Sequence, residues 1–354
     1  MARRVTITDV AHEAGVSIAT VSKVINGRHG IAAATVARVQ DVVDRLGYEQ
    51  SIVARSLRSQ RTNVIGVLVA EFEPFSTEIL KGAGAALAGT GHALLAYTGG
   101  SDRPGWERRY LSRLSGTLID GAVLVTPTVT LAGEEIPVVA VDPHTGPDEL
   151  PSVDSDNFAG AVLATRHLLD LGHTRIGFLG GRTDLESSRL REAGFRQTLA
   201  EAGLEADPEL VRVAEYRRDG ADEPTAAMLA LPQPPTAIFA GNDLSAMGIL
   251  DTARRLGVSV PGELSVVGFD DVPEAAATQP PLTTVRQEIQ QLGGHAVRML
   301  LEQLGVAGGA GVGAVSGGGG VVGSGAGGGG EAAAPAHVRL PTTLVVRGST
   351  APPR

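Results

Sequence analysis

Small polar side chains, small apolar side chains and one cation alternate between Ser17 and Asn26, in the stretch Ser-Ile-Ala-Thr-Val-Ser-Lys-Val-Ile-Asn. Helical spacing would turn Val21, Val24 and Ile25 inward. The residues expected on the outer face are Ser17, Ile18, Ala19, Thr20, Ser22, Lys23 and Asn26. Such side chains bond to base edges, contact methyl groups and meet phosphates when a helix enters the major groove. They predict DNA recognition, and the alternative is an ordinary surface helical hairpin.

A shorter helix is expected to come first and to position this one. Thr6 can cap it, and Asp9, three residues later, completes a capping box. Gly15 ends the helix, because glycine adopts the left-handed backbone most easily. Ser17 then caps the second helix. A third helix is expected at 33–46 and closes a small helical core.

Residues 6–26 follow the pattern T-x-x-D-V-A-x-x-A-G-V-S-x-A-T-V-S-x-V-I-N and resemble the headpiece of the lactose and galactose repressor (LacI/GalR) family. The resemblance implies a homodimer on a pseudo-palindromic double-stranded operator. It identifies residues 51–59 as a hinge helix that folds on operator DNA, with Leu57 inserted into the minor groove. The alternative for this segment is a flexible basic linker. The resemblance also implies DNA contacts for Thr6, Tyr48 and Ala54.

Composition divides the chain into a basic head and an acidic body. The 354 residues carry a net charge of −9. Residues 1–61 hold nine Arg and Lys against five Asp and Glu, a charge of +4, which leaves −13 for the remainder. This division fits a DNA-binding module joined to a part that does not touch DNA. There is no cysteine, which excludes disulfides and thiolate chemistry. No apolar leader and no long apolar run is seen, so we expect a cytoplasmic location and no membrane contact.

Beyond residue 62, apolar strands and helices alternate, which is typical of parallel, doubly wound sheets. Strands are expected at 64–69, 93–97, 122–125, 138–141, 176–179, 211–214, 237–240, 266–269 and 337–346, and helices at 77–87, 106–114, 157–171, 187–202, 221–231, 244–256 and 288–304. We expect two Rossmann-like lobes over 62–354, which is the periplasmic-binding-protein type I architecture that the resemblance implies. Residues 305–330 are nearly all Gly, Ala, Val and Ser, and they are expected to form a flexible insert.

A ligand site is expected at the carboxyl ends of the strands. The side chains that follow predicted strands include aromatics, an arginine, an asparagine and a carboxylate, which together suit a polyhydroxylated ligand. The resemblance implies effector contacts at Arg191, Asn242 and Asp270, and variable contacts at Phe72, Phe75, Ser187 and Tyr216.

Several of these and neighbouring residues also have plainer interpretations. Phe72 and Phe75 could belong to the core. Asp243 and Asp271 could cap helices or pair across the lobes. Asp154, Asp156 and Asn157 have no calcium-loop spacing, so we expect them to cap a helix and line the crossing between lobes rather than bind a metal.

These observations favour a dimeric repressor of carbohydrate-utilisation genes that a sugar-type inducer releases from DNA. The alternative is a corepressor-dependent regulator that binds a purine or another small metabolite. A free sugar-binding protein is less favoured, because the chain has a basic head and no leader. No nucleophile elbow, zinc-protease motif, P-loop or complete dinucleotide motif occurs, so neither an enzyme nor a cofactor is expected.

Overall fold

The computed structural model describes the chain except for residues 1–4, 26–29, 49–60, 101–104, 130–135, 147–149 and 307–335. The chain divides into two compact units, Met1–Thr62 with Gly116–Leu118, and Asn63–Ser115 with Ile119–Arg354. We call the helices before residue 49 the headpiece, and residues 63–354 the body. Within the described ranges, no helix is long and apolar enough to cross a membrane.

The headpiece consists of α1 (Ile7–Ala14), α2 (Ile18–Ile25) and α3 (Ala33–Leu46). The predicted caps are confirmed. The Thr6 hydroxyl accepts a hydrogen bond from the Asp9 amide, and the Asp9 carboxylate accepts one from the Thr6 amide. Gly15 has a left-handed φ of 66°. The Ser17 hydroxyl accepts from the Thr20 amide at 3.2 Å.

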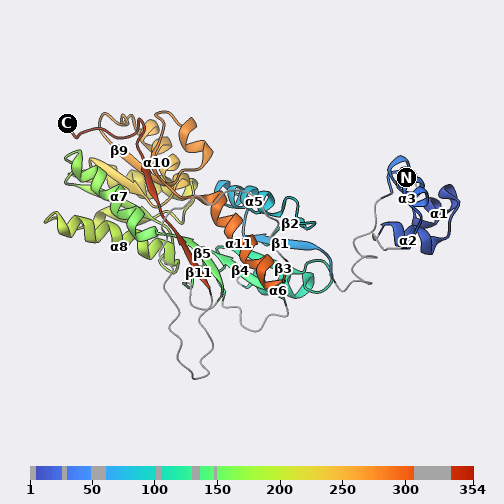
Figure 1. Cartoon of the computed structure of the whole chain (residues 1–354). Helices are drawn as coiled ribbons and strands as arrows, with labels where there is room; N and C mark the ends of the chain where they lie inside the picture. Colours follow the sequence, from blue (N-terminus) through green and yellow to red (C-terminus); the bar gives the residue numbers. More distant parts are fainter. Residues whose placement is uncertain are drawn as a thin grey trace, which may run out of the picture. The chain divides into compact units, whose positions relative to one another are not determined.

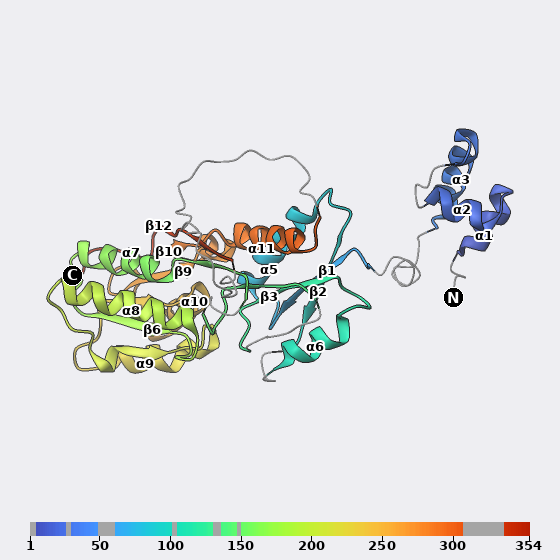
Figure 2. The same ribbon diagram turned by 60° about the horizontal axis from the view of Figure 1, so that its bottom comes forward.

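The first lobe of the body is a six-stranded sheet in the order β11-β5-β4-β3-β1-β2 (Figure 1). Helices α5 and α11 cover one face, and α6 covers the other (Figure 2). The four inner strands, β5, β4, β3 and β1, are buried along their whole length, because helices pack on both sides of a parallel sheet. The elements are β1 (Val64–Val69), α5 (Pro74–Leu87), β2 (Ala93–Thr98), α6 (Trp106–Leu114), β3 (Gly121–Val125), β4 (Val138–Val141), β5 (Ser152–Ser155), α11 (Ile289–Gln303) and β11 (His337–Leu340).

The second lobe is a six-stranded sheet in the order β12-β10-β9-β8-β6-β7, parallel except for the antiparallel β10–β12 pair. Helices α7 and α8 pack together on one face, and α9 and α10 pack with each other. The elements are α7 (Asn157–Asp170), β6 (Ile176–Gly180), α8 (Glu186–Glu201), β7 (Val211–Val213), α9 (Asp222–Leu229), β8 (Ala237–Ala240), α10 (Asp243–Leu256), β9 (Ser265–Asp270), β10 (Thr283–Arg286), β12 (Thr343–Val345) and 3₁₀ turns at Pro208–Leu210, Asp219–Ala221 and Pro273–Ala277. The prediction of two doubly wound lobes is confirmed.

Three described connections pass between the lobes: β5 to α7, β10 to α11, and β11 to β12. The last of these corrects a prediction. Residues 337–346 were expected to form one strand, but the structure divides them between the two sheets. Pro341 lies at the break, and proline cannot donate to a sheet ladder.

Helices α5 and α11 of the first lobe touch through their backbones. A Cβ atom on Gly82 of α5 would lie 1.8 Å from the Gln290 carbonyl oxygen, and one on Gly293 of α11 would lie 2.3 Å from the Ile79 carbonyl oxygen. Backbone atoms have little freedom to retreat, so we treat the two helices as one rigid pair, the α5–α11 pair.

This contact predicts opposite outcomes for two substitutions in one helix. Gly82→Ala should lower the free energy of unfolding by about 1–3 kcal/mol, because the new methyl group overpacks the contact. Gly84→Ala is the matched control, because its Cβ would meet nothing within 4 Å. It should raise stability by about 0.5–1 kcal/mol through helix propensity. Denaturant unfolding of both variants measures the difference, and equal effects would show that the helices are not in close contact.

Candidate functional sites

Helix α2 presents the outer face that the sequence predicts. Ile18 is 46% exposed, and Ser17, Ala19 and Lys23 are exposed as well. Thr20 and Ser22 are half-buried, while Val21 and Val24 are buried in the headpiece core. A large apolar side chain in solvent at the start of a cationic helix fits contact with a thymine methyl group.

The remaining predicted DNA contacts divide into two groups. Thr6 is engaged in the capping box, and Tyr48 is half-buried against the headpiece core. Asn26, Ala54 and Leu57, the hinge segment 51–59 and most of the insert 305–330 lie outside the described residues. The DNA contacts of all five side chains stay predictions.

A buried arginine forms the centre of the second site. Arg191 lies on α8 and is 3% exposed. Its Nε donates to the Asn157 side-chain oxygen at 2.8 Å, and its Nη1 donates to the Gly241 carbonyl oxygen. The same Nη1 lies 3.6 Å from Asp270 Oδ1. The guanidinium carbon is 3.8 Å from the centroid of the Phe269 ring.

Carboxyl groups from both lobes surround this guanidinium. Asp270 ends β9 of the second lobe, and Asp142 follows β4 of the first. Burial raises the pKa of Asp270 to about 7, and Arg191 opposes that rise while Glu73 and Asp142 add to it. Burial likewise raises the pKa of Asp142 and that of Glu73, the N-cap of α5. We call these three acids and Arg191 the interlobe cluster.

The backbone is strained along the same edge of both sheets. Thr126, Asp142 and Asp270 follow or end β3, β4 and β9 with φ values of 47°, 49° and 117°. Glu215 and Tyr216, just beyond β7, have φ values of 55° and 61°. Non-glycine residues seldom adopt positive φ, and clusters of them mark functional sites. The strain therefore lies at the strand ends where a ligand was expected.

Most of the predicted effector residues in the second lobe lie around Arg191. The Tyr216 ring lies 5.4 Å from the guanidinium carbon of Arg191, and its hydroxyl is buried near Ser187 and Ser188. Burial raises the Tyr216 pKa. Asn242 caps α10, and its side-chain nitrogen donates to the Tyr216 carbonyl oxygen at 3.0 Å. Ser187 is buried one helical turn before Arg191.

The two predicted aromatics of the first lobe differ from each other. Phe75, in the first turn of α5, is partly buried against the core. Phe72, in the loop after β1, is 52% exposed and is not a core residue. Their effector contacts stay predictions.

The other acidic residues have structural partners. Asp156 caps α7, and Asp154 forms a two-point ion pair with Arg339 at 2.9 Å. Asp243 accepts hydrogen bonds from Thr284 and from the Val272 amide, and Asp271 pairs with Arg286 and Arg347. The partners of Asp243 and Asp271 belong to the second lobe, so neither residue forms these bonds across the lobes.

Sequence reasoning missed four members of the site: Glu73, Asp142, Asn157 as the Arg191 partner, and Gln287, whose side-chain nitrogen donates to Asp270 Oδ1. Asp142 carried a usable signal, because it directly follows a predicted strand. Gln287 carried none, because β10, which precedes it, was not predicted.

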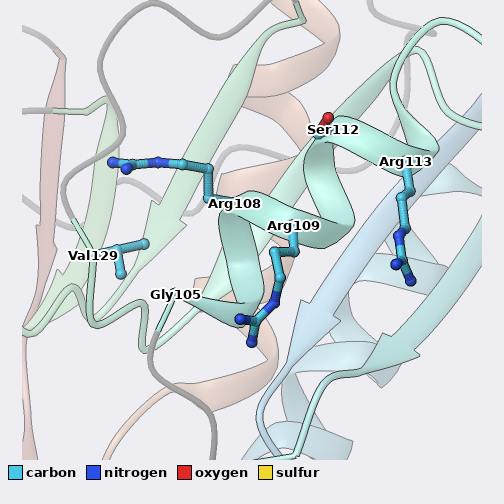
Figure 3. A pocket seen from close by; sticks show the side chains of 6 residues that line it. All are labelled: Gly105, Arg108, Arg109, Ser112, Arg113 and Val129. Atoms are coloured by element: carbon cyan, nitrogen blue, oxygen red, sulfur yellow. The ribbon is translucent and has the colours of Figure 1, made fainter.

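Two shallow hollows lie elsewhere on the body. One, of about 430 Å³, is lined by Gly105, Arg108, Arg109, Ser112, Arg113 and Val129. Its arginine side chains point in different directions and do not converge on one point (Figure 3). The other, of about 470 Å³, is lined by Arg218, Asp219, Asp222, Gly248, Asp251, Thr252 and Arg255, and its arginines pair with its aspartates. Neither hollow includes a residue of the interlobe cluster.

A helix-turn-helix headpiece on a two-lobed α/β body defines a class, the DNA-binding regulators that carry their own effector domain. Residues 6–51 match the family described as "Bacterial regulatory proteins, lacI family", and residues 165–350 match the "Periplasmic binding protein-like domain". The chain is 35% identical to the HTH-type transcriptional repressor PurR of Aliivibrio salmonicida, over 84% of this chain and 92% of the relative. It is also 35% identical to the HTH-type transcriptional regulator MalR of Streptomyces coelicolor, over 84% and 90%.

Solved structures agree with these relatives. A lac repressor dimer bound to operator and the anti-inducer ONPF matches with a TM-score of 0.80 at 25% identity, over 99% of this chain and 100% of that chain. The regulator CelR in complex with cellobiose matches with a TM-score of 0.68 at 29% identity, over 98% and 100%. The chain therefore belongs to the LacI family and is a DNA-binding transcriptional regulator.

The burial of Asp270 predicts a pH-dependent effect of Asp270→Asn on stability. Burial raises the pKa of Asp270 from 3.8 to about 7, so the folded chain retains a proton that the unfolded chain releases. Ionisation of Asp270 therefore lowers the free energy of unfolding progressively as the pH rises from 3.8 to about 7, and above about pH 7 this loss is complete. Asparagine stays neutral. The gain in Tm of Asp270→Asn over the natural chain should be larger at about pH 8 than at about pH 5. An equal gain in Tm at the two pH values would contradict this predicted effect of Asp270 ionisation.

Proposed function

We propose that the chain is a homodimeric repressor of carbohydrate-utilisation genes, released from its operator by a sugar-type inducer that binds at the interlobe cluster. The observation that carries this proposal is the buried Arg191–Asp270 pair beside Asp142 of the other lobe. Adjacent sugar hydroxyls both donate and accept, so they can bond to a guanidinium and a carboxylate at once. The complex of CelR with cellobiose supports a sugar as the ligand class.

The DNA side of the proposal rests on α2 and on dimerisation. Two headpieces in a homodimer would read two half-sites of a pseudo-palindromic operator, because a two-fold protein matches a two-fold sequence. The structural match to a lac repressor dimer on its operator supports this arrangement. The hinge residues Ala54 and Leu57 would contact the minor groove between the half-sites.

A corepressor that tightens DNA binding is the second candidate function. The half-buried rings of Phe75 and Tyr216 favour it, because aromatic faces stack on a planar heterocycle such as a purine. The two candidates differ in the sign of the effector's influence on operator affinity.

The recognition helix can be tested through Lys23. Lysine offers donors to guanine O6 and N7, so Lys23→Ala should weaken binding to an operator selected from random duplexes by about 1–3 kcal/mol. Its effect on unrelated DNA should be much smaller. Arg38→Ala on α3 is the matched control, because it removes a headpiece cation outside α2. Fluorescence anisotropy at fixed salt measures both affinities. Equal losses on both DNAs for Lys23→Ala would reduce this residue to a phosphate contact.

The effector site can be tested through Asp270. Cellobiose, maltose, ribose and hypoxanthine are screened by thermal shift, and each hit is titrated against operator affinity. A sugar hit should weaken operator binding about 5- to 150-fold, the usual range of allosteric coupling. Asp270→Ala should abolish that response and leave binding to unrelated DNA unchanged. Asp251→Ala, on the outer surface of α10, should respond normally. A ligand that tightens operator binding would replace the induction scheme with the corepressor scheme.

A further inference from the structure

A glutamine at the second crossing between the lobes, from β10 to α11, donates two hydrogen bonds to Asp270. Gln287 lies between β10 and α11 and is 4% exposed. Its side-chain nitrogen donates to Asp270 Oδ1 at 2.6 Å, and its backbone amide donates to the Asp270 carbonyl oxygen at 3.2 Å. Its side-chain oxygen is buried and has no hydrogen-bond partner among the described residues. The amide is thus half satisfied, with its free acceptor beside the interlobe cluster.

The chain that follows Gln287 leads directly into the first lobe. Helix α11 begins at Ile289, two residues later, and forms the α5–α11 pair through the contacts at Gly82 and Gly293. Helix α5 carries Glu73 at its N-cap, and the charge of Glu73 acts on Asp270. A displacement of Gln287 would therefore move a rigid helix pair whose other end faces the same carboxylate.

We propose that Gln287 is a positioning residue that transmits the state of the Asp270 carboxylate to the α5–α11 pair. The proposal rests on the proposed function in one respect, that the effector is what changes this carboxylate. A ligand hydroxyl that donates to Asp270 competes with the Gln287 side-chain nitrogen. A second hydroxyl that donates to the free Gln287 oxygen satisfies the unpaired acceptor. Both changes act on the residue that begins the crossing to α11.

Four charged groups and one neutral amide surround Asp270, each from a different part of the chain. Arg191 faces it from α8, Glu73 from the start of α5, Asp142 from the end of β4 and Asp243 from α10, while Gln287 donates from the crossing. The hydrogen bond from Gln287 favours the ionised carboxylate and lowers the Asp270 pKa, as the positive charge of Arg191 does. Removal of the Gln287 donor should raise the Asp270 pKa, because one of the interactions that lower this pKa is then lost while burial and the acidic neighbours still raise it.

The test needs no effector, because Asp270→Asn itself changes the state of the group. Hydrogen exchange of 289–303 and 74–87 is followed by mass spectrometry in the full chain, with and without Asp270→Asn. The substitution should change exchange in both segments by about two- to thirtyfold, the range of coupling carried by single residues. In the Gln287→Leu background this change should vanish. In the Gln290→Leu background it should persist, because Gln290 also lies on α11 but donates to Glu78 within the first lobe.

A pH profile separates positioning from a merely structural role. Ionisation of Asp270 lowers Tm up to a certain pH. That upper pH limit should rise in Gln287→Leu and stay unchanged in Gln290→Leu. Gln287→Met serves as the second variant if the leucine chain does not fold, and it should behave alike. Persistence of the exchange change without Gln287, or an unmoved pH profile, would overturn the proposal. Failure of the effector screen would leave these measurements unaffected, so it would count against the proposed function alone.

Discussion

A guanidinium buried almost completely between two lobes is the constraint on which the rest of the body depends. Removing the Arg191 charge from water is costly, and the cost falls only where hydrogen-bond acceptors and opposite charge replace the water. The chain supplies the Asn157 side-chain oxygen, the Gly241 carbonyl oxygen, the Asp270 carboxylate and the face of Phe269. These groups come from α7, the end of β8 and β9, so the ends of three elements are fixed around one side chain.

The same side chains also hold the crossings between the lobes. Asn157 begins α7 directly after the first crossing, and its side-chain nitrogen donates to Asp142 of the first lobe at 3.3 Å. Gln287 lies on the second crossing and holds Asp270. At the third crossing, the Thr342 hydroxyl donates to the Asp156 carbonyl oxygen at 3.4 Å, beside Asn157. A ligand that alters the hydrogen bonds of the interlobe cluster would therefore act directly on the residues at the crossings between the lobes.

The sequence predicts those parts of the fold that are governed by apolar burial. The helices at 33–46 and 106–114 and the strands at 64–69, 138–141 and 237–240 have the predicted bounds. Strands β5 and β10 escaped prediction because their sequences, Ser-Val-Asp-Ser and Thr-Thr-Val-Arg, are largely polar, although all of these residues except Arg286 are buried. Arg191 and Asp270 were expected at the site from the family pattern, and the structure places them together. Gln287 depends on contacts from another part of the chain, and periodicity carries no information about such contacts.

The charge balance of the cluster limits the effector. The interlobe cluster combines three acids, Glu73, Asp142 and Asp270, with the single guanidinium of Arg191, and burial raises the pKa of each acid. A phosphorylated or carboxylated ligand would add negative charge in a low-dielectric space where the acids already oppose one another. An uncharged ligand rich in hydroxyl or N–H donors would instead bond to the carboxylates and to the free Gln287 oxygen. Sugars and neutral heterocycles both meet this requirement, and their phosphates do not. If the effector binds at the interlobe cluster, as proposed, the electrostatics favours an uncharged one.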